Sequence, residues 1–111
     1  MTSEHWSVET LDAMVDAEIA ALPGDLRARL SRIGSMIEEL GLERLRDPYV
    51  RHLEGPLWEI RLRGRDRIAR ALYVTAVGRR VIIVRAFVKK TQKTPRREVE
   101  LALTRARRVS R

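Results

Sequence analysis

Cysteine is absent from the 111-residue sequence, and no apolar run is long enough to cross a bilayer. A chain without thiols forms no disulfide and no thiolate metal site, so a reducing cytoplasm is its expected compartment. The opening residues, MTSEHWSVET, also lack the basic and apolar regions of a signal peptide. We therefore expect a soluble, cytoplasmic protein that does not act at a membrane.

Nucleotide-binding and metal-binding signatures are missing as well. The sequence contains neither a GxxxxGKS/T loop nor a GxGxxG loop, so no nucleotide cofactor is expected. Its two histidines, His5 and His52, lie far apart in unrelated contexts and form no metal-site or triad signature. We predict that the protein uses no cofactor and no metal.

Acidic side chains become scarce in the second half of the chain. Residues 1–56 hold eleven acids and six arginines, a net charge of −5, whereas residues 57–84 carry +5 and residues 85–111 carry +8. Clustered lysine and arginine attract phosphates, which predicts a surface for a polyanion. Nucleic acid is favoured over anionic lipid, because the apolar face of the expected C-terminal helix has no membrane-seeking aromatic residue. The acidic first half is interpreted as a cover for the sheet.

The length and the 44% of hydrophobic residues fit one compact domain over residues 1–111. Residues 5–9 are expected to form a short strand. Thr10 then offers the N-cap of a first helix, which should end at Leu22 because Pro23 and Gly24 follow it.

The second helix has the clearest pattern in the chain. Asp25 is the expected N-cap, and Gly41 follows the last helical residue. The apolar residues recur at helical spacing: Leu26, Leu30, Ile33, Ile37 and Leu40. Residues 41–56 are expected to be a connection without regular structure.

From residue 57 the hydrophobic period changes to two, which predicts a strand over residues 57–63. Its expected buried face consists of Trp58, Ile60 and Leu62. Residues 68–76 and 80–88 predict two more strands, and the short turns make the three an antiparallel meander. Thr94 and Pro95 are the expected N-cap and first residue of a final helix. This order predicts an α+β domain with helices packed on an antiparallel sheet.

Two arginines of the first two meander strands can become neighbours. The turn geometry places Arg61 beside Arg70, and two guanidinium groups together suit the oxygens of a phosphate. The alternative is that these arginines are solvated or pair with Glu59. The sequence leaves both interpretations open.

A second cationic group follows the last strand. Lys89, Lys90 and Lys93, together with the free N–H groups of the helix start near Thr94, could address one anion. A solvated lysine-rich loop is the commoner explanation of such a run.

Aromatic residues are few, at 5% of the chain. Trp58 and Phe87 are expected in the core, whereas Tyr73 could equally be buried or stack on a base.

Residues 57–102 carry three elements that resemble a known family. They are LWEIR from Leu57, an RxxY element from Arg70 to Tyr73, and FVKKTQKTP from Phe87 to Pro95. Together they are similar to the phage-derived branch of the RelE/HigB-like toxins of type II toxin–antitoxin systems. The likeness extends more loosely over the N-terminal HWSVETLDAMVDAEIAALP.

The resemblance implies a RelE-like α+β fold, with an antiparallel three- to four-stranded sheet, two N-terminal helices and one C-terminal helix. It implies ribosome-dependent cleavage of mRNA, in which the RNA 2′-hydroxyl attacks the adjacent phosphate without a metal. It also implies a cognate helix-turn-helix antitoxin, which would form a hetero-oligomer with the toxin.

The resemblance further assigns five catalytic positions: Arg61, Arg70, Lys89, Lys90 and Lys93. Arg70 and Lys90 would stabilise charge, Arg61 and Lys89 would hold flanking phosphates, and Lys93 is a candidate acid or base. Some superfamily members have a lysine where this chain has Glu59, so the general base stays open between Glu59 and Lys93. Positions expected to contact RNA are Arg63, Tyr73, Arg85, Phe87, Arg96 and Arg97.

Two other functions are compatible with a basic surface. A non-catalytic RNA- or ribosome-binding protein would share the charge and the fold. A DNA-binding regulator is disfavoured, because no helix-turn-helix pair carries the positive charge.

Overall fold

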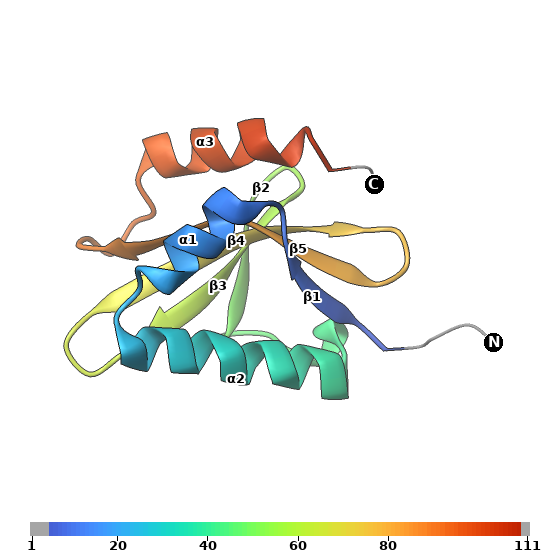
Figure 1. Cartoon of the computed structure of the whole chain (residues 1–111), viewed down its shortest axis with the longest axis horizontal. Coiled ribbons are helices and arrows are strands. Elements are labelled where there is room, and N and C mark those ends of the chain that lie inside the picture. Colours follow the sequence, from blue (N-terminus) through green and yellow to red (C-terminus); the bar gives the residue numbers. More distant parts are fainter. Residues whose placement is uncertain (1–4, 110–111) are drawn as a thin grey trace.

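The computed structural model describes residues 5–109. Within that range the chain forms five strands, three α-helices and one short 3-10 helix (Figure 1). In order they are β1 (Ser7–Thr10), α1 (Ala13–Ala20), α2 (Gly24–Leu40), η1 (Leu42–Arg44), β2 (Val50–Glu54), β3 (Leu57–Arg63), β4 (Ile68–Ala76), β5 (Arg80–Lys89) and α3 (Arg96–Ala106).

The strands of residues 5–109 form one mixed sheet in the order β1-β5-β4-β3-β2. The meander of β3, β4 and β5 is antiparallel, as predicted, and β1 joins β5 in parallel. The prediction of an antiparallel sheet of three to four strands was therefore one strand short, and it was wrong in direction for β1 alone among the described strands. The strand missed was β2, which lies inside residues 41–56 and pairs with β3. Its five residues, VRHLE, are too short and too polar to show a period of two.

Helices cover both faces of the sheet. Figure 1 shows α2 running along one face and α3 along the opposite one. The core under α2 includes Ile60, Leu62, Ala71 and Tyr73. The core under α3 is built from Leu57, Leu72, Val74, Ile82, Val84, Phe87, Val99, Ala102 and Ala106. Because α3 contributes mainly valine and alanine to this contact, it packs close to the strands.

Ion pairs supplement the small apolar contact of α3. Glu18 of α1 lies between two buried or half-buried arginines, with 2.8 Å to Arg105 of α3 and 3.1 Å to Arg85 of β5. Arg85 also donates two hydrogen bonds to Glu98, at 2.7 and 3.0 Å. The Glu18 carboxylate also accepts a hydrogen bond from the Ala86 backbone N–H, at 3.2 Å, which joins α1 to β5. This network fastens α3 to the sheet and to α1.

The three predicted helix caps differ from the observed ones. Asp12, not Thr10, caps α1 by accepting a hydrogen bond from Val15 N at 3.0 Å. In α2 and α3 a proline occupies the N-cap position, at Pro23 and Pro95. The side chains predicted as caps make tertiary contacts instead: the Asp25 carboxylate accepts from the backbone of the β3–β4 turn, and Thr94 binds to β3.

Trp58, predicted to be buried, is exposed, and so is the last apolar residue of the α2 pattern, Leu40. Leu40, at the end of α2, is 57% exposed, and Trp58, near the start of β3, is 38% exposed. Both lie where the cover provided by α2 ends. Residues 5–109 contain no helix that combines the length and the apolar character required to span a membrane.

Candidate functional site

The site is organised by the register of three strands. Arg61 of β3 lies directly opposite Arg70 of β4, as the turn geometry predicted, and Phe87 of β5 lies opposite Arg70 on its other side. The three side chains share the face of the sheet that α3 covers only in part. The two guanidinium groups therefore come from neighbouring strands.

Glu59 and Arg70 form a buried ion pair on this face. Each residue is 4% exposed, and Arg70 Nε lies 3.3 Å from Glu59 Oε1. The same carboxylate oxygen accepts a hydrogen bond from Thr94 Oγ1 at 2.9 Å. Glu59 thus ties the segment before α3 to the sheet. Of the two interpretations left open by the sequence, pairing with Glu59 holds for Arg70.

Arg61 has a different and weaker partner. Its guanidinium lies 3.7 Å from the carboxylate of Asp47, whose side chain is 63% exposed. Ion pairs of this kind contribute little, about 0–1 kcal/mol, because water competes for both groups. Arg61 is therefore available to another anion.

Two buried donors at the site lack an acceptor. Within residues 5–109, the Nε atoms of Arg61 and Arg70 are buried and have no hydrogen-bond partner. For Arg70 the 3.3 Å approach to Glu59 is an electrostatic contact without hydrogen-bond geometry. An unmet buried donor costs on the order of 1–3 kcal/mol, and a bound anion would remove that cost.

Lys89 completes the cationic group. It is 4% exposed, and its ammonium group donates to the backbone carbonyl of Gln92. Burial lowers the pKa of Lys89 most, and the positive charges of Arg70 and Arg61 lower it further, whereas Glu59 opposes the shift. A lysine with a lowered pKa can give or take a proton more readily near neutral pH.

The pKa of the Arg70 guanidinium is also lowered. Burial is the main cause, the Glu59 carboxylate works against it, and the charge of Arg61 adds to it. Positive charge is thus held in this place at a free-energy cost that an anionic ligand would reduce.

The arginines open into a cavity of about 490 Å³, which we call the arginine pocket. Arg61, Arg63 and Arg70 line it from the sheet. Three residues that the sequence analysis did not single out line the other sides: Arg29 of α2, Tyr49 before β2, and Gln92 after β5. No motif marks them, because they come together only through the packing of α2 and the loops on β3.

The remaining predicted lysines lie away from this pocket wall. Lys90 and Lys93 are exposed in the segment between β5 and α3. Lys93 lines a separate cavity of about 730 Å³ with Thr94 and Arg96. The structure therefore places Lys89, rather than Lys90, beside the paired arginines, and the roles of Lys90 and Lys93 stay predictions.

Most residues predicted to contact RNA have other partners in this structure. Arg85 is held by Glu98 and Glu18, and Phe87 is in the core with the Arg85 guanidinium 5.5 Å from its ring centre. Tyr73 is 1% exposed on the opposite face, and burial raises the pKa of its hydroxyl. RNA contact by these side chains stays a prediction.

The arginines at the start of α3 are exposed. Arg96 donates to both oxygens of Glu54, at 2.5 and 3.0 Å, and lies near Glu100. Arg97 is exposed beside it.

No candidate metal site is found among residues 5–109. No three histidine, aspartate or glutamate side chains lie close enough together there to hold a metal ion.

The fold is similar to that of RelE. The chain is similar to a protein in the crystal structure of the archaeal RelE–RelB complex from Pyrococcus horikoshii OT3, with a TM-score of 0.56 and 20% identity. The match covers 76% of this chain and 94% of the other. At 20% identity the likeness shows the fold alone. A separate comparison with curated proteins found no match.

The family follows from the sequence itself. Residues 17–107 match the family model described as phage derived protein Gp49-like (DUF891). The chain belongs to this family, which is a family of RelE/HigB-like toxins. The resemblance carried by the LWEIR, RxxY and FVKKTQKTP elements is thereby confirmed.

Proposed function

We propose that the chain is the toxin of a type II toxin–antitoxin system and that it cleaves mRNA on the ribosome. The observation that carries this proposal is the pair of buried, unmatched Nε donors of Arg61 and Arg70 in the arginine pocket. A phosphodiester supplies the missing acceptors, and guanidinium groups bind phosphate oxygens in a fixed geometry.

The proposed bond changes take place within the RNA, and side chains of this protein assist them. The 2′-oxygen of one nucleotide attacks the adjacent phosphorus, the bond from phosphorus to the 5′-oxygen breaks, and a 2′,3′-cyclic phosphate remains. The 2′-hydroxyl loses a proton and the 5′-oxygen gains one. Arg61 and Arg70 stabilise the extra negative charge on the phosphorane, which is the largest catalytic contribution of such sites.

Lys89 is the residue best suited to transfer a proton. It is buried beside both arginines, and its pKa is lowered. Glu59 is less suited to act as the base, because Arg70 and Thr94 already engage its carboxylate. We assign Glu59 to positioning Arg70 and the segment before α3.

The partner of such a toxin would be an antitoxin. The similar archaeal protein was crystallised as a RelE–RelB complex, which supports a protein partner for this chain as well. We propose a helix-turn-helix antitoxin and, as the site of action, mRNA bound to the ribosome.

The test is cleavage in a purified translation system, with the 5′ ends of the mRNA mapped by primer extension. We expect discrete cuts from the parent protein and a loss of about 10²–10³-fold with Arg61→Ala. Arg32→Ala is the matched control, because Arg32 is exposed on α2 and lines none of the cavities described. Ribosome binding without cuts would favour the non-catalytic alternative, and equal activity of Arg61→Ala would contradict the assigned site.

A further inference from the structure

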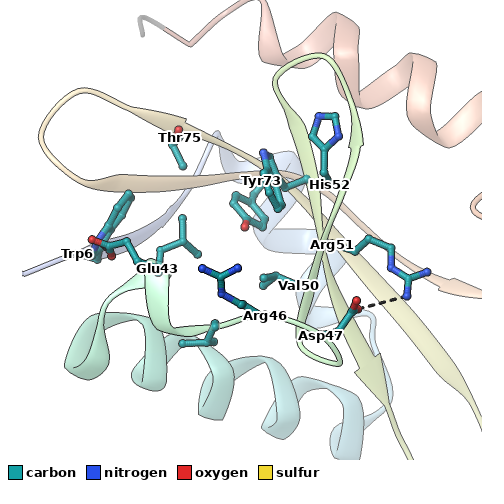
Figure 2. A pocket seen from close by; sticks show the side chains of 12 residues that line it. Trp6, Glu43, Arg46, Asp47, Val50, Arg51, His52, Tyr73 and Thr75 are labelled. Atoms are coloured by element: carbon teal, nitrogen blue, oxygen red, sulfur yellow. Dashed lines mark hydrogen bonds and ion pairs between the residues drawn. The ribbon is translucent and has the colours of Figure 1, made fainter.

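A third cavity, of about 730 Å³, lies on the face of the sheet that α2 covers, beyond the end of α2 (Figure 2). Figure 2 shows Trp6, Arg46, Val50, His52 and Tyr73 around it. Trp58 also lines it. We call this cavity the aromatic groove. Nothing in the proposed cleavage reaction uses it.

The walls of the aromatic groove are fixed by specific contacts. Trp6 Nε1 donates to Glu43 Oε1 at 2.8 Å, which joins the segment before β1 to η1. The rings of His52 and Trp58 meet edge to face, with their centres 5.1 Å apart. Tyr73, which lies opposite Trp58 across β3 and β4, is almost fully buried. The groove therefore exists before any partner binds.

Two side chains of the groove are exposed and could contact a partner: Arg46 and Trp58. Arg46 is exposed, and no acidic side chain of residues 5–109 pairs with it. Figure 2 shows its guanidinium group and the hydroxyl of Tyr73 both facing the cavity. Trp58 is 38% exposed on a face of β3 that is otherwise core. The aromatic rings could contact a bulky apolar side chain of a partner, and Arg46 could pair with a carboxylate next to that side chain.

We infer that the aromatic groove binds an extended segment of the antitoxin, with an apolar side chain in the cavity and an acidic neighbour on Arg46. The inference rests on the proposed function, because it takes the partner to be an antitoxin. A net charge of +8 favours an acidic protein over a second copy of this chain.

RNA is a poorer occupant than a polypeptide. The rim carries Glu43 and Asp47 as well as Arg46 and Arg51, so its charge is balanced. Phosphates would meet carboxylates there, whereas the arginine pocket is lined by arginines alone among its charged residues.

The sheet edge beside the groove supports a polypeptide. In the described part of the chain β2 pairs only with β3, so no strand there pairs with the outer edge of β2. Val50 and His52 of this edge strand line the groove. A segment that runs along β2 could therefore bind through its backbone and place side chains in the cavity.

The experiment compares two double variants with the same change in charge. Arg46→Glu/Trp58→Ala alters the groove. Arg32→Glu/Leu101→Ala is the control, because Leu101 is also 38% exposed but lies on α3. The probe is the product of the reading frame next to this gene, and its affinity for each full-length variant is measured by calorimetry. Growth arrest on expression and thermal unfolding are recorded in parallel.

We expect the groove variant to bind the probe at least about tenfold more weakly than the parent. The groove variant should still arrest growth, but co-expression of the probe should no longer restore growth. The control should bind and be relieved as the parent is. Equal affinity of both variants would overturn the inference, and so would a parent that does not bind the probe. Loss of growth arrest in the parent would instead refute the proposed function. Protection of Trp58 by RNA, or dimerisation lost only in the groove variant, would assign the groove to another occupant.

Discussion

Replacement of Glu59 by glutamine separates its role as a counter-ion from a role as general base. The substitution keeps an acceptor for Thr94 Oγ1 but removes the charge that faces Arg70. Removal of one partner from a buried pair costs about 3–5 kcal/mol. Because Arg70 also donates to the Ala69 carbonyl at 2.9 Å, we expect the lower end, about 3 kcal/mol.

The stability effect is measured by thermal or urea unfolding. For a chain of this length, about 3 kcal/mol corresponds to a fall in Tm of roughly 10–15 °C. Glu39→Gln is the matched control, since Glu39 is exposed at the end of α2, and it should leave Tm nearly unchanged.

The pH–rate profile of Glu59→Gln distinguishes the two roles of Glu59. The Glu59 carboxylate raises the pKa of Lys89, so its removal lowers that pKa further. The limb of the pH–rate profile that reports Lys89 should therefore move to lower pH in Glu59→Gln, with cleavage retained. A loss of cleavage at every pH, with no shift of the limb, would show that Glu59 is the base and would refute this reasoning.

Four further outcomes are expected. Lys89→Met should lower cleavage about 10²–10⁴-fold with ribosome affinity kept, as measured by single-turnover kinetics and sedimentation. Glu18→Gln should destabilise the protein by roughly 3 kcal/mol in urea unfolding, because two arginines lose their shared counter-ion. Gly64→Ala should cost about 1–3 kcal/mol in the same assay, since an added Cβ would lie 2.5 Å from Asp25 Oδ2. Hydrogen bonds from Arg80 and Ser7 lower the pKa of Glu9 to about 2. The ionised Glu9 therefore stabilises the folded state above pH 4.5, and acid titrations of stability should show this contribution being lost between about pH 4.5 and 2.

The sequence predicted the parts of the fold that local patterns determine. The apolar stripe of α2 and the alternation in β3 have clear periods, and the short turn between β3 and β4 places Arg61 opposite Arg70. Strand β2 was missed because VRHLE has no such period and is stabilised by pairing with β3. A single sequence does not reveal that kind of tertiary support.

The site was predicted in part for a similar reason. The register of β3 and β4 could be counted along the chain, but the direction of the lysines after β5 could not. Lys89 is still the last residue of β5 and lies buried beside Arg70, whereas Lys90 is the first residue beyond it and is exposed. Arg29 and Tyr49 join the arginine pocket from distant segments, which no spacing within one segment can show.

The central claim is that Arg61 and Arg70 hold the same phosphate. A double-mutant cycle of Arg61→Ala and Arg70→Lys measures this directly, because the lysine keeps a charge against Glu59 while it removes the guanidinium fork. If both arginines bind one phosphate, the double variant should cleave mRNA little more slowly than the slower single variant. Losses of rate that multiply would place the two arginines on separate groups and contradict the account.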